Sequence, residues 1–325
     1  MYEGKRVLII DQLNLFFRNY IVNPSLSTNG APIGGLKGCF QSIQKICRES
    51  KPVDLIVICW DGAGGSTKRK NLKKDYKAGR KPIRLNRGIR NMSSEEEVEN
   101  KFWQQSRLIE YYNHVPVVQF MFDGTEADDI IAYVSQLKEL SGSEKLIVSS
   151  DKDFFQLLNS KTVQFRPIQK EVLNEKAIVK KFDIHPNNFA MARAMAGDKS
   201  DNIEGIEGLG LKTIAKRFPF LKQEKSATFK DVLDHCQEMT LESKAKAYQK
   251  VLDSESLLKR NYQMMQLYAP SLDVSSKKLI RETLKNPDLS FNKTELIKMM
   301  LKDGFGEINF VELFQYFNRI SIDNR

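Results

Sequence analysis

Four short apolar runs in the first half of the chain have the length and composition of β-strands, and stretches with helical spacing separate them. The runs are Val7–Ile10, Leu55–Trp60, Val115–Phe122 and Leu146–Val148, and the helical patterns cover residues 35–49 and 127–140. This alternation predicts an α/β fold in which helices cover a central, mainly parallel sheet. After about residue 185 the patterns are helical and strand-like runs are rare, so we place a boundary there.

Each predicted strand stops at an acidic residue. The first ends at Asp11, the second at Asp61, the third at Asp123, and the fourth leads through two serines into Asp151 and Asp153. The carboxyl ends of parallel strands share one edge of a sheet, where α/β proteins place their sites, so we expect these acids to meet in space. Aspartate is also a common turn residue, and that interpretation stays open for any single position.

A second acidic signal follows the third strand. The residues from Thr125 to Asp128 have the form of a capping box that would open a helix at Asp129–Leu140. The acids Glu126, Asp128 and Asp129 exceed what capping requires, and a helix N-terminus tolerates carboxylates that also bind a metal.

The candidate metal ligands fall into four compact signals and are Asp11, Asp61, Glu126, Asp128, Asp129, Asp151, Asp153, Asp198 and Asp201. So many carboxylates at one sheet edge would raise one another's pKa and destabilise the fold unless cations were bound. None of the three histidines lies in these signals, and the four cysteines lack metal-ligand spacing. An all-oxygen set suits Mg²⁺ or Mn²⁺ rather than Zn²⁺, and a set of this size can hold two ions ~4 Å apart for phosphodiester hydrolysis.

Positive charge is concentrated in one segment. The chain has 51 Lys and Arg against 41 Asp and Glu, a net charge of +10, and residues 66–90 alone hold eleven basic residues and one acid. Such a segment is either a solvated loop or a surface for a polyanion. The chain starts without an apolar leader and its apolar runs are too short to span a bilayer, so we expect a soluble, cytoplasmic monomer without a membrane partner.

A glycine-rich motif lies in the helical half of the chain, with Gly205, Gly208, Gly210, Lys212 and Thr213 as its candidate DNA-binding residues. Its glycines would let backbone N–H groups approach a phosphate, and Lys212 at a helix start would add positive potential. The motif is not a P-loop, because Leu211 separates the last glycine from the lysine and no strand precedes it. A plain turn between two helices is the alternative.

Five segments, taken in order, resemble the flap endonuclease and 5′→3′ exonuclease family, which includes phage enzymes and the nuclease domain of bacterial DNA polymerase I. They are LIIDQLNLFFR, CWDG, TEADDIIAYV, SSDKDFFQLL and GDKSDNIEGIEGLGLKTI, within residues 7–217. The resemblance implies a PIN-like nuclease domain over residues 1–185 with a basic arch at about 66–105. It implies a helical region over residues 186–325 that contains a helix–three-turn–helix (H3TH) element and C-terminal helices.

The same resemblance assigns roles to single residues. All nine acids match metal-site positions of the family: Asp11, Asp61, Glu126 and Asp128 lie nearer one ion, and Asp151, Asp153, Asp198 and Asp201 lie nearer the other. Arg69 and the segment from Tyr76 to Arg80 resemble the base of the arch. The resemblance implies that Arg69 binds DNA, that Lys77 and Arg80 face the scissile phosphate, and that Tyr76 binds DNA by stacking on an unpaired base. The glycine motif would grip duplex DNA, and family members also hold a monovalent cation on carbonyls of this hairpin. Residues 81–94, with Pro82 and Gly88, depart from a well-formed arch helix, so their order without DNA is an open question.

The implied activity is a structure-selective 5′-nuclease of DNA replication or repair that acts on branched or nicked DNA as flap endonuclease and 5′→3′ exonuclease. RNA primers in an RNA–DNA hybrid are an open alternative substrate, because phosphate contacts carry little information about the sugar. A non-catalytic junction-binding module is the rival class, although it has no need of nine acids. An aspartyl-phosphate enzyme is set aside, because position 121, two residues before Asp123, is Met. No replication-protein partner is identified; the apolar stretch Phe310–Phe317 is either such a contact or core.

Overall fold

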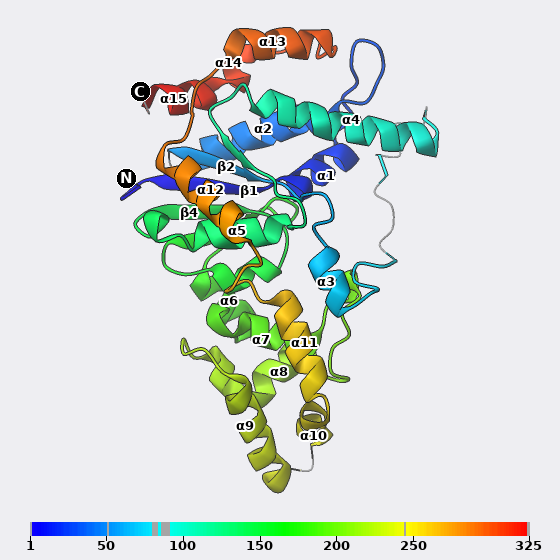
Figure 1. Ribbon diagram of the computed structural model, residues 1–325, viewed down its shortest axis with the longest axis vertical. Coiled ribbons are helices and arrows are strands. Elements are labelled where there is room, and N and C mark those ends of the chain that lie inside the picture. Colours follow the sequence, from blue (N-terminus) through cyan, green and yellow to red (C-terminus); the bar gives the residue numbers. More distant parts are fainter. Residues whose placement is uncertain (1, 51, 80–83, 86–91, 244, 324–325) are drawn as a thin grey trace.

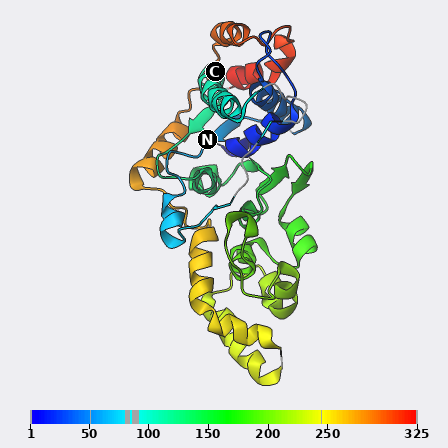
Figure 2. The ribbon, with the colours of Figure 1, turned by 90° about the vertical axis from the view of Figure 1, so that its right-hand side faces the viewer.

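The computed structural model describes residues 2–50, 52–79, 84–85, 92–243 and 245–323. An α/β part carries a single sheet, and a helical part extends away from it, which gives the molecule an elongated outline (Figures 1 and 2).

The sheet has six strands in the spatial order β3-β2-β1-β4-β5-β6. They are β1 (Arg6–Asp11), β2 (Leu55–Cys59), β3 (Val118–Phe120), β4 (Glu144–Val148), β5 (Thr162–Arg166) and β6 (Glu171–Leu173). Neighbouring strands are parallel except β5 and β6, which are antiparallel. The predicted mainly parallel sheet is therefore confirmed, and so are the four predicted strands, although β3 is shorter than its apolar run.

Helices cover both faces of the sheet. On one face lie α1 (Gln12–Val22), α2 (Gly34–Glu49) and α4 (Ser94–Tyr112), and on the other lies α5 (Ala127–Ser135) (Figure 1). Helix α2 buries Leu36, Phe40, Ile43 and Cys47, which recur at helical spacing, so one apolar side of the helix faces the core. The strands β1 and β2 are buried along nearly their whole length, as expected for parallel strands covered on both faces.

The helical part has a hydrophobic core of its own. Its helices are α6 (Glu175–Phe182), α7 (Pro186–Ala196), α8 (Leu211–Arg217), α9 (Phe229–Glu242), α10 (Lys246–Asp253) and α11 (Glu255–Met265). Buried side chains between Phe155 and Leu258 form this second core, which includes Phe189 and Phe218. Helices α7 and α8 enclose the glycine-rich motif.

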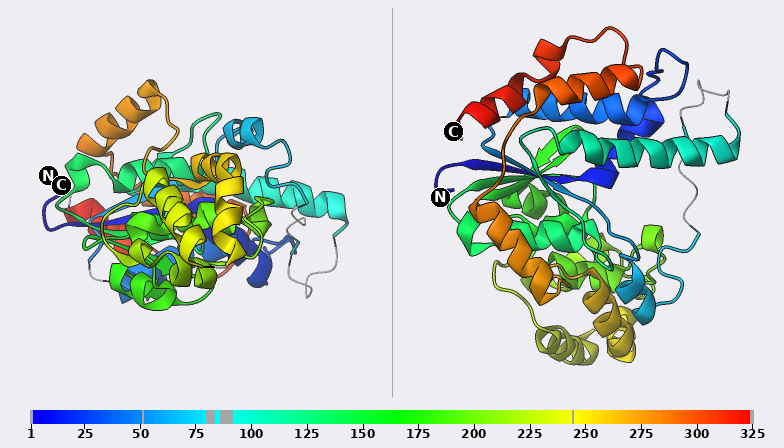
Figure 3. Two further views of the ribbon diagram at one scale, coloured as in Figure 1. Left: turned by 90° about the horizontal axis from the view of Figure 1, so that it is seen from below. Right: turned by 45° about the horizontal axis from the view of Figure 1, so that its top comes forward.

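The C-terminal helices do not extend the helical part. They are α12 (Val274–Lys285), α13 (Lys293–Lys302), α14 (Phe310–Leu313) and α15 (Gln315–Asp323), and their buried side chains belong to the core around the sheet. Figure 3 shows that α13 and α15 lie over α2, whereas α12 lies on the other side of the strands. Phe314 and Phe317 are fully buried, and Phe317 packs edge to face on Phe40. The sequence predicts one helical region over residues 186–325. In the structure, α12 to α15 instead bury their apolar side chains against the α/β part.

In the part of the chain that the structure describes, no helix is both long enough and apolar enough to cross a membrane.

Candidate metal and nucleic-acid site

Asp11, at the carboxyl end of β1, is bonded to the residue that follows the carboxyl end of β4. Asp11 is the last residue of β1 and the N-cap of α1, and its Oδ1 accepts the N–H of Asn14 at 3.2 Å. Its Oδ2 accepts the hydroxyl of Ser149, directly after β4, at 2.8 Å. The bond to Ser149 joins the carboxyl ends of two adjacent parallel strands, β1 and β4, as parallel pairing predicts.

Asp61 follows β2 and caps the helix that begins with the second acidic signal. Its Oδ1 accepts the backbone N–H of Ala127, the first residue of α5, at 2.7 Å. The N-cap residue Glu126 makes no side-chain capping bond, so the capping box predicted for Thr125 and Asp128 is wrong. A carboxylate from another strand end satisfies the helix terminus instead.

Glu126 is the most heavily bonded acid in the site. It accepts hydrogen bonds from Ser66, from Nη1 of Arg69 and from Nζ of Lys77, the last at 2.7 Å. Burial opposes its ionisation, but the cations of Arg69 and Lys77 outweigh this and lower the pKa of Glu126. The base of the arch is thus bonded directly into the acidic site.

A buried arginine links the fourth strand end to the helical part. Arg193 on α7 donates to Oδ1 of Asp153 at about 3.0 Å and to Oδ2 of Asp198. Arg193 belongs to no motif and was not predicted from the sequence. The one available signal was its position five residues before Asp198, on a helix with no other charged residue. Burial opposes the ionisation of Asp198, but Arg193 and the hydrogen bonds from Ser200 outweigh burial and lower the pKa of Asp198 below its ordinary value.

Burial, together with neighbouring carboxylates, raises the pKa of five acids, which are Asp11, Asp61, Asp128, Asp151 and Asp153. Burial together with the nearby Asp61 carboxylate raises the pKa of Asp11 to about 7, and burial together with Asp151 raises the pKa of Asp153 to about 7. The pKa of Asp128 is raised well above its ordinary value by burial, then by Asp151 and Glu126. Since Asp201 contributes to the raised pKa of Asp151, eight of the nine predicted acids form one electrostatic group.

Asp129 is the exception. Its Oδ1 accepts the N–H of Ser271 at 2.7 Å and its Oδ2 accepts Nη1 of Arg69 at 3.1 Å. The first bond ties α5 to the segment after α11, and the second ties it to α3 (Thr67–Leu72). We place Asp129 beside the acidic group, as the residue that holds Arg69 against Glu126, rather than within it.

The acidic group fits divalent cations by its chemistry. Its candidate ligands are carboxylate oxygens, which hard cations prefer. Burial and neighbouring carboxylates raise the pKa of Asp11 and Asp153 to about 7, and a bound cation would favour their ionised forms. Among the described residues, no three of the acids already converge as a formed metal site. The nine ligand assignments accordingly stay predictions.

Two residues predicted to bind DNA are engaged inside the protein. Arg69 is largely buried, and besides its two carboxylates it donates from Nε to the carbonyl of Met264 at 2.9 Å. The Tyr76 ring is 4% exposed and packs with Ile203, Met264 and Met265. In this structure the ring is closed off from an unpaired base, because it is buried against these three residues and Nζ of Lys77 lies 5.0 Å from its centroid. Lys77 is bonded to Glu126, and its role at the scissile phosphate stays a prediction. Arg80 lies outside the described residues.

The glycine-rich motif forms the connection between α7 and α8. A Cβ on Gly205 would lie 2.1 Å from the carbonyl oxygen of Ala196, so Gly205 permits close contact with the end of α7. Gly208 has φ +81 with open space around it, and Gly210 is the N-cap of α8. Lys212 is exposed in the first turn of α8 and Thr213 is half-buried. The geometry is a helix–hairpin–helix with an exposed turn and an exposed cation.

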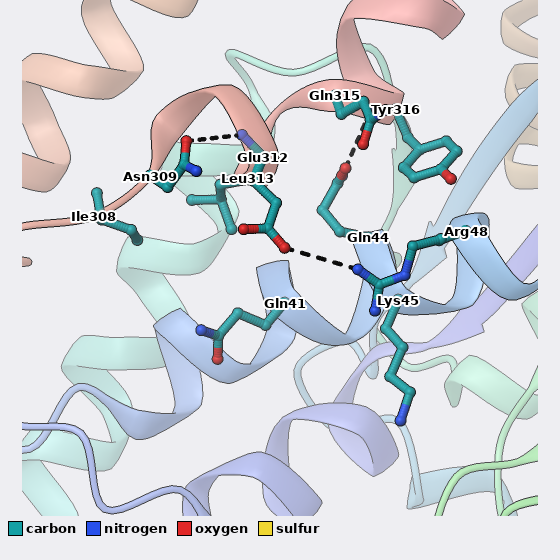
Figure 4. A pocket seen from close by; sticks show the side chains of 10 residues that line it. All are labelled: Gln41, Gln44, Lys45, Arg48, Ile308, Asn309, Glu312, Leu313, Gln315 and Tyr316. Carbon is teal, nitrogen blue, oxygen red and sulfur yellow. Dashed lines mark hydrogen bonds and ion pairs between the residues drawn. The ribbon is translucent and has the colours of Figure 1, made fainter.

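A cavity of about 340 Å³ lies elsewhere, between α2 and the α14–α15 segment (Figure 4). Its lining includes Lys45 and Arg48, and Arg48 pairs with Glu312 at 3.7 Å. None of the nine acids lines it, so we do not assign it to the acidic site.

Comparison with known proteins identifies the family. Residues 6–183 match the family model described as the 5′-3′ exonuclease, N-terminal resolvase-like domain, so the chain belongs to this family. It is 26% identical over 312 residues to the 5′-3′ exonuclease of Aquifex aeolicus, covering 94% of this chain and 96% of that protein. It is 30% identical over 216 residues to the thermostable DNA polymerase I of Thermus thermophilus, covering 66% of this chain and 24% of the polymerase.

Solved structures share the fold. The T5 D15 protein co-crystallized with metal ions superposes with a TM-score of 0.62 at 20% identity, over 97% of this chain and 98% of that one. The catalytic core of Rad2 in complex with DNA substrate gives a TM-score of 0.54 at 13% identity, over 98% and 93% of the two chains. The predicted PIN-like α/β fold with a helical H3TH region is therefore confirmed.

Proposed function

We propose that the protein is a structure-selective 5′-nuclease of DNA replication or repair that hydrolyses phosphodiester bonds in branched or nicked DNA with the help of divalent metal ions. The observation that carries this proposal is the gathering of acids from the ends of β1, β2 and β4 with two acids from the α7–α8 connection, and Lys77 among them. The T5 D15 flap endonuclease, crystallised with DNA and metal ions, shares the fold at a TM-score of 0.63 and 21% identity over 93% of this chain and 100% of that one, which supports the proposal.

Two ions, Mg²⁺ or Mn²⁺, are the proposed cofactors. Asp11, Asp61, Glu126 and Asp128 would hold one, and Asp151, Asp153, Asp198 and Asp201 the other. Bound there, such ions activate water and stabilise the leaving oxygen in phosphodiester hydrolysis.

The protein's own cations have separate tasks. Lys77 is bonded to Glu126 here, and its amine is free to rotate to a phosphate once a bound ion compensates Glu126. A fixed cation at that position stabilises charge that develops on the phosphate. Arg69 and Arg193 hold carboxylates in place: Arg69 fixes Glu126, and Arg193 fixes Asp153 relative to Asp198.

The connection between α7 and α8 is the proposed grip on duplex DNA. Exposed Gly208 leaves room for a backbone approach, and Lys212 supplies a cation beside the start of α8. Such contacts go to phosphates, so they position the duplex without reading its sequence. A monovalent cation on the hairpin carbonyls is part of this proposal.

The test is cleavage of end-labelled flap, nicked, blunt and RNA–DNA substrates with Mg²⁺, with Mn²⁺ and with EDTA. We expect cleavage near the junction with either ion, none with EDTA, and faster cleavage of flap than of blunt DNA. Tight binding of every substrate without cleavage in either ion would instead identify a non-catalytic junction-binding module. Equal rates on DNA and RNA–DNA substrates would extend the substrate to primers.

A further inference from the structure

Two segments that are far apart in sequence are bonded together beside the acidic group. The backbone N–H of Lys77, at the base of the arch, donates to the carbonyl of Asp201 at 2.9 Å. In the opposite direction, Nδ2 of Asn202 donates to the carbonyl of Asp75 at 3.0 Å and to its Oδ2 at 2.7 Å. The hydroxyl of Tyr76 also donates to Oδ2 of Asp201 at 3.2 Å, so backbone and side-chain hydrogen bonds together join residues 75–77 to residues 201–202.

The backbone at this junction is unusual. Lys77 has φ 60 and Asn202 has φ 58, so both adopt the left-handed conformation. Asparagine tolerates this conformation, but lysine rarely adopts it and needs surrounding contacts to hold it there. For Lys77 those contacts include the bond to the Asp201 carbonyl and the buried ring of the preceding Tyr76.

Each side of the junction leads to a different part of the proposed machinery. Lys77 carries the amine that is bonded to Glu126. Asn202 stands three residues before Gly205, at the start of the hairpin, and Ile203 beside it packs against Tyr76. A movement of the hairpin on DNA would therefore be passed to the backbone of Lys77.

We propose that Asn202 is a positioning residue that couples seating of duplex DNA on the hairpin to placement of Lys77 in the acidic group. The inference rests on the proposed nuclease function. Asn202 is the residue to change, because its amide makes both side-chain bonds, whereas Asp75 also pairs with Lys73 at 2.8 Å.

The test is the variant Asn202→Gly, which keeps the left-handed backbone accessible and removes the amide. At saturating enzyme, we expect single-turnover cleavage of a flap with a long duplex arm to fall about tenfold, the scale of lost hydrogen bonds that act in the transition state. The affinity for the same DNA should stay within about twofold. Asn187→Ala is the matched control, because that amide also donates to a backbone carbonyl, Glu224 at 2.8 Å, but away from the arch.

A second substrate separates coupling from local damage. With a duplex arm too short to reach the hairpin, wild type and Asn202→Gly should cleave at the same rate, because no seated duplex is available to be coupled. The variant Asp75→Ala, which removes one of the two side-chain bonds, should show the same pattern with a smaller loss.

Unchanged cleavage of the long-arm substrate by both variants would overturn the inference. An equal loss on long-arm and short-arm substrates would also overturn it, since the residue would then only maintain local structure. If the wild-type chain cleaves nothing with either divalent ion, the proposed function itself fails, and the inference fails with it.

Discussion

Nζ of Lys77 lies 2.7 Å from Oε1 of Glu126, so a cation of the arch base is bonded to an acid of the proposed metal site. Two basic residues of the preceding helix α3 (Thr67–Leu72) differ from it: Lys70 is exposed, and Arg69 is largely buried against Glu126. The basic residues of this segment therefore have three different environments: Lys77 lies in the acidic site, Arg69 is buried in ion pairs, and Lys70 is exposed to solvent.

The variant Lys77→Ala should slow single-turnover cleavage by ~10²-fold or more, the scale for loss of one preorganised electrostatic group. The exposed Lys70→Ala should cost less than about tenfold, because such a cation only attracts the DNA backbone and its effect fades at high salt. Arg80, outside the described residues, is expected to follow Lys77 with a smaller loss. The rates are measured at saturating enzyme. Matching rates for Lys77→Ala and Lys70→Ala would show that the segment only attracts DNA.

The variant Arg69→Ala should mainly destabilise the protein. Arg69 compensates Glu126 and Asp129, both buried, and removing one partner of a buried ion pair costs about 3–5 kcal/mol. Denaturant unfolding measures this cost, with Lys70→Ala as the control on the same helix. A fully stable Arg69→Ala that has lost affinity for DNA would restore the role predicted from the sequence.

The metal-free protein should lose stability as the pH rises from about 4 to about 7. The folded-state pKa values of Asp11 and Asp153 are raised to about 7, so the folded state retains protons that the unfolded chain releases near pH 4. Glu126 and Asp198 have lowered pKa values and act in the opposite direction at lower pH.

Thermal unfolding at several pH values, with EDTA and with excess Mn²⁺, measures this effect. At pH 7 the ion should raise the midpoint by about 3 °C or more, because it binds the folded state and replaces the lost protons. At pH 5 its effect should be smaller. A midpoint that rises between pH 5 and 7 in EDTA would contradict the interpretation.

The variant Lys212→Ala should weaken binding to duplex DNA more than it slows cleavage of bound substrate. Loss of one phosphate contact should reduce the slope of log affinity against log salt by about one unit. Lys230→Ala, an exposed lysine on α9, is the control. An unchanged slope for Lys212→Ala would mean that the hairpin only joins two helices.

The sequence predicted those parts of the structure that depend on local pattern. Continuous apolar runs predicted β1, β2 and β4. The acids that follow the carboxyl end of each run predicted the location of the site, because parallel strands all end at one edge of the sheet. The sequence did not predict β5 and β6, because TVQFR is half polar and EVL is three residues long. Pairing of β5 with β4 and of β6 with β5, rather than composition, makes these segments strands.

Errors arose where a distant residue decides the local structure. The N-terminus of α5 is capped by Asp61 from another strand, which the pattern around Thr125 does not reveal. Tyr76 is buried by Met264 and Met265, and the C-terminal helices return to the sheet, through contacts that span most of the chain. Arg193 carries no motif, and only its position against Asp153 and Asp198 shows its role.

We expect the acidic group, and not the basic surface alone, to make this protein a nuclease. Single-turnover cleavage of a 5′-flap substrate by Asp128→Ala and by Asp151→Ala in Mg²⁺, measured together with DNA affinity, tests it most directly. We predict that both variants lose cleavage while their affinity for DNA is unchanged or higher, because each removes a carboxylate that repels phosphate. Normal turnover by both variants would contradict the account.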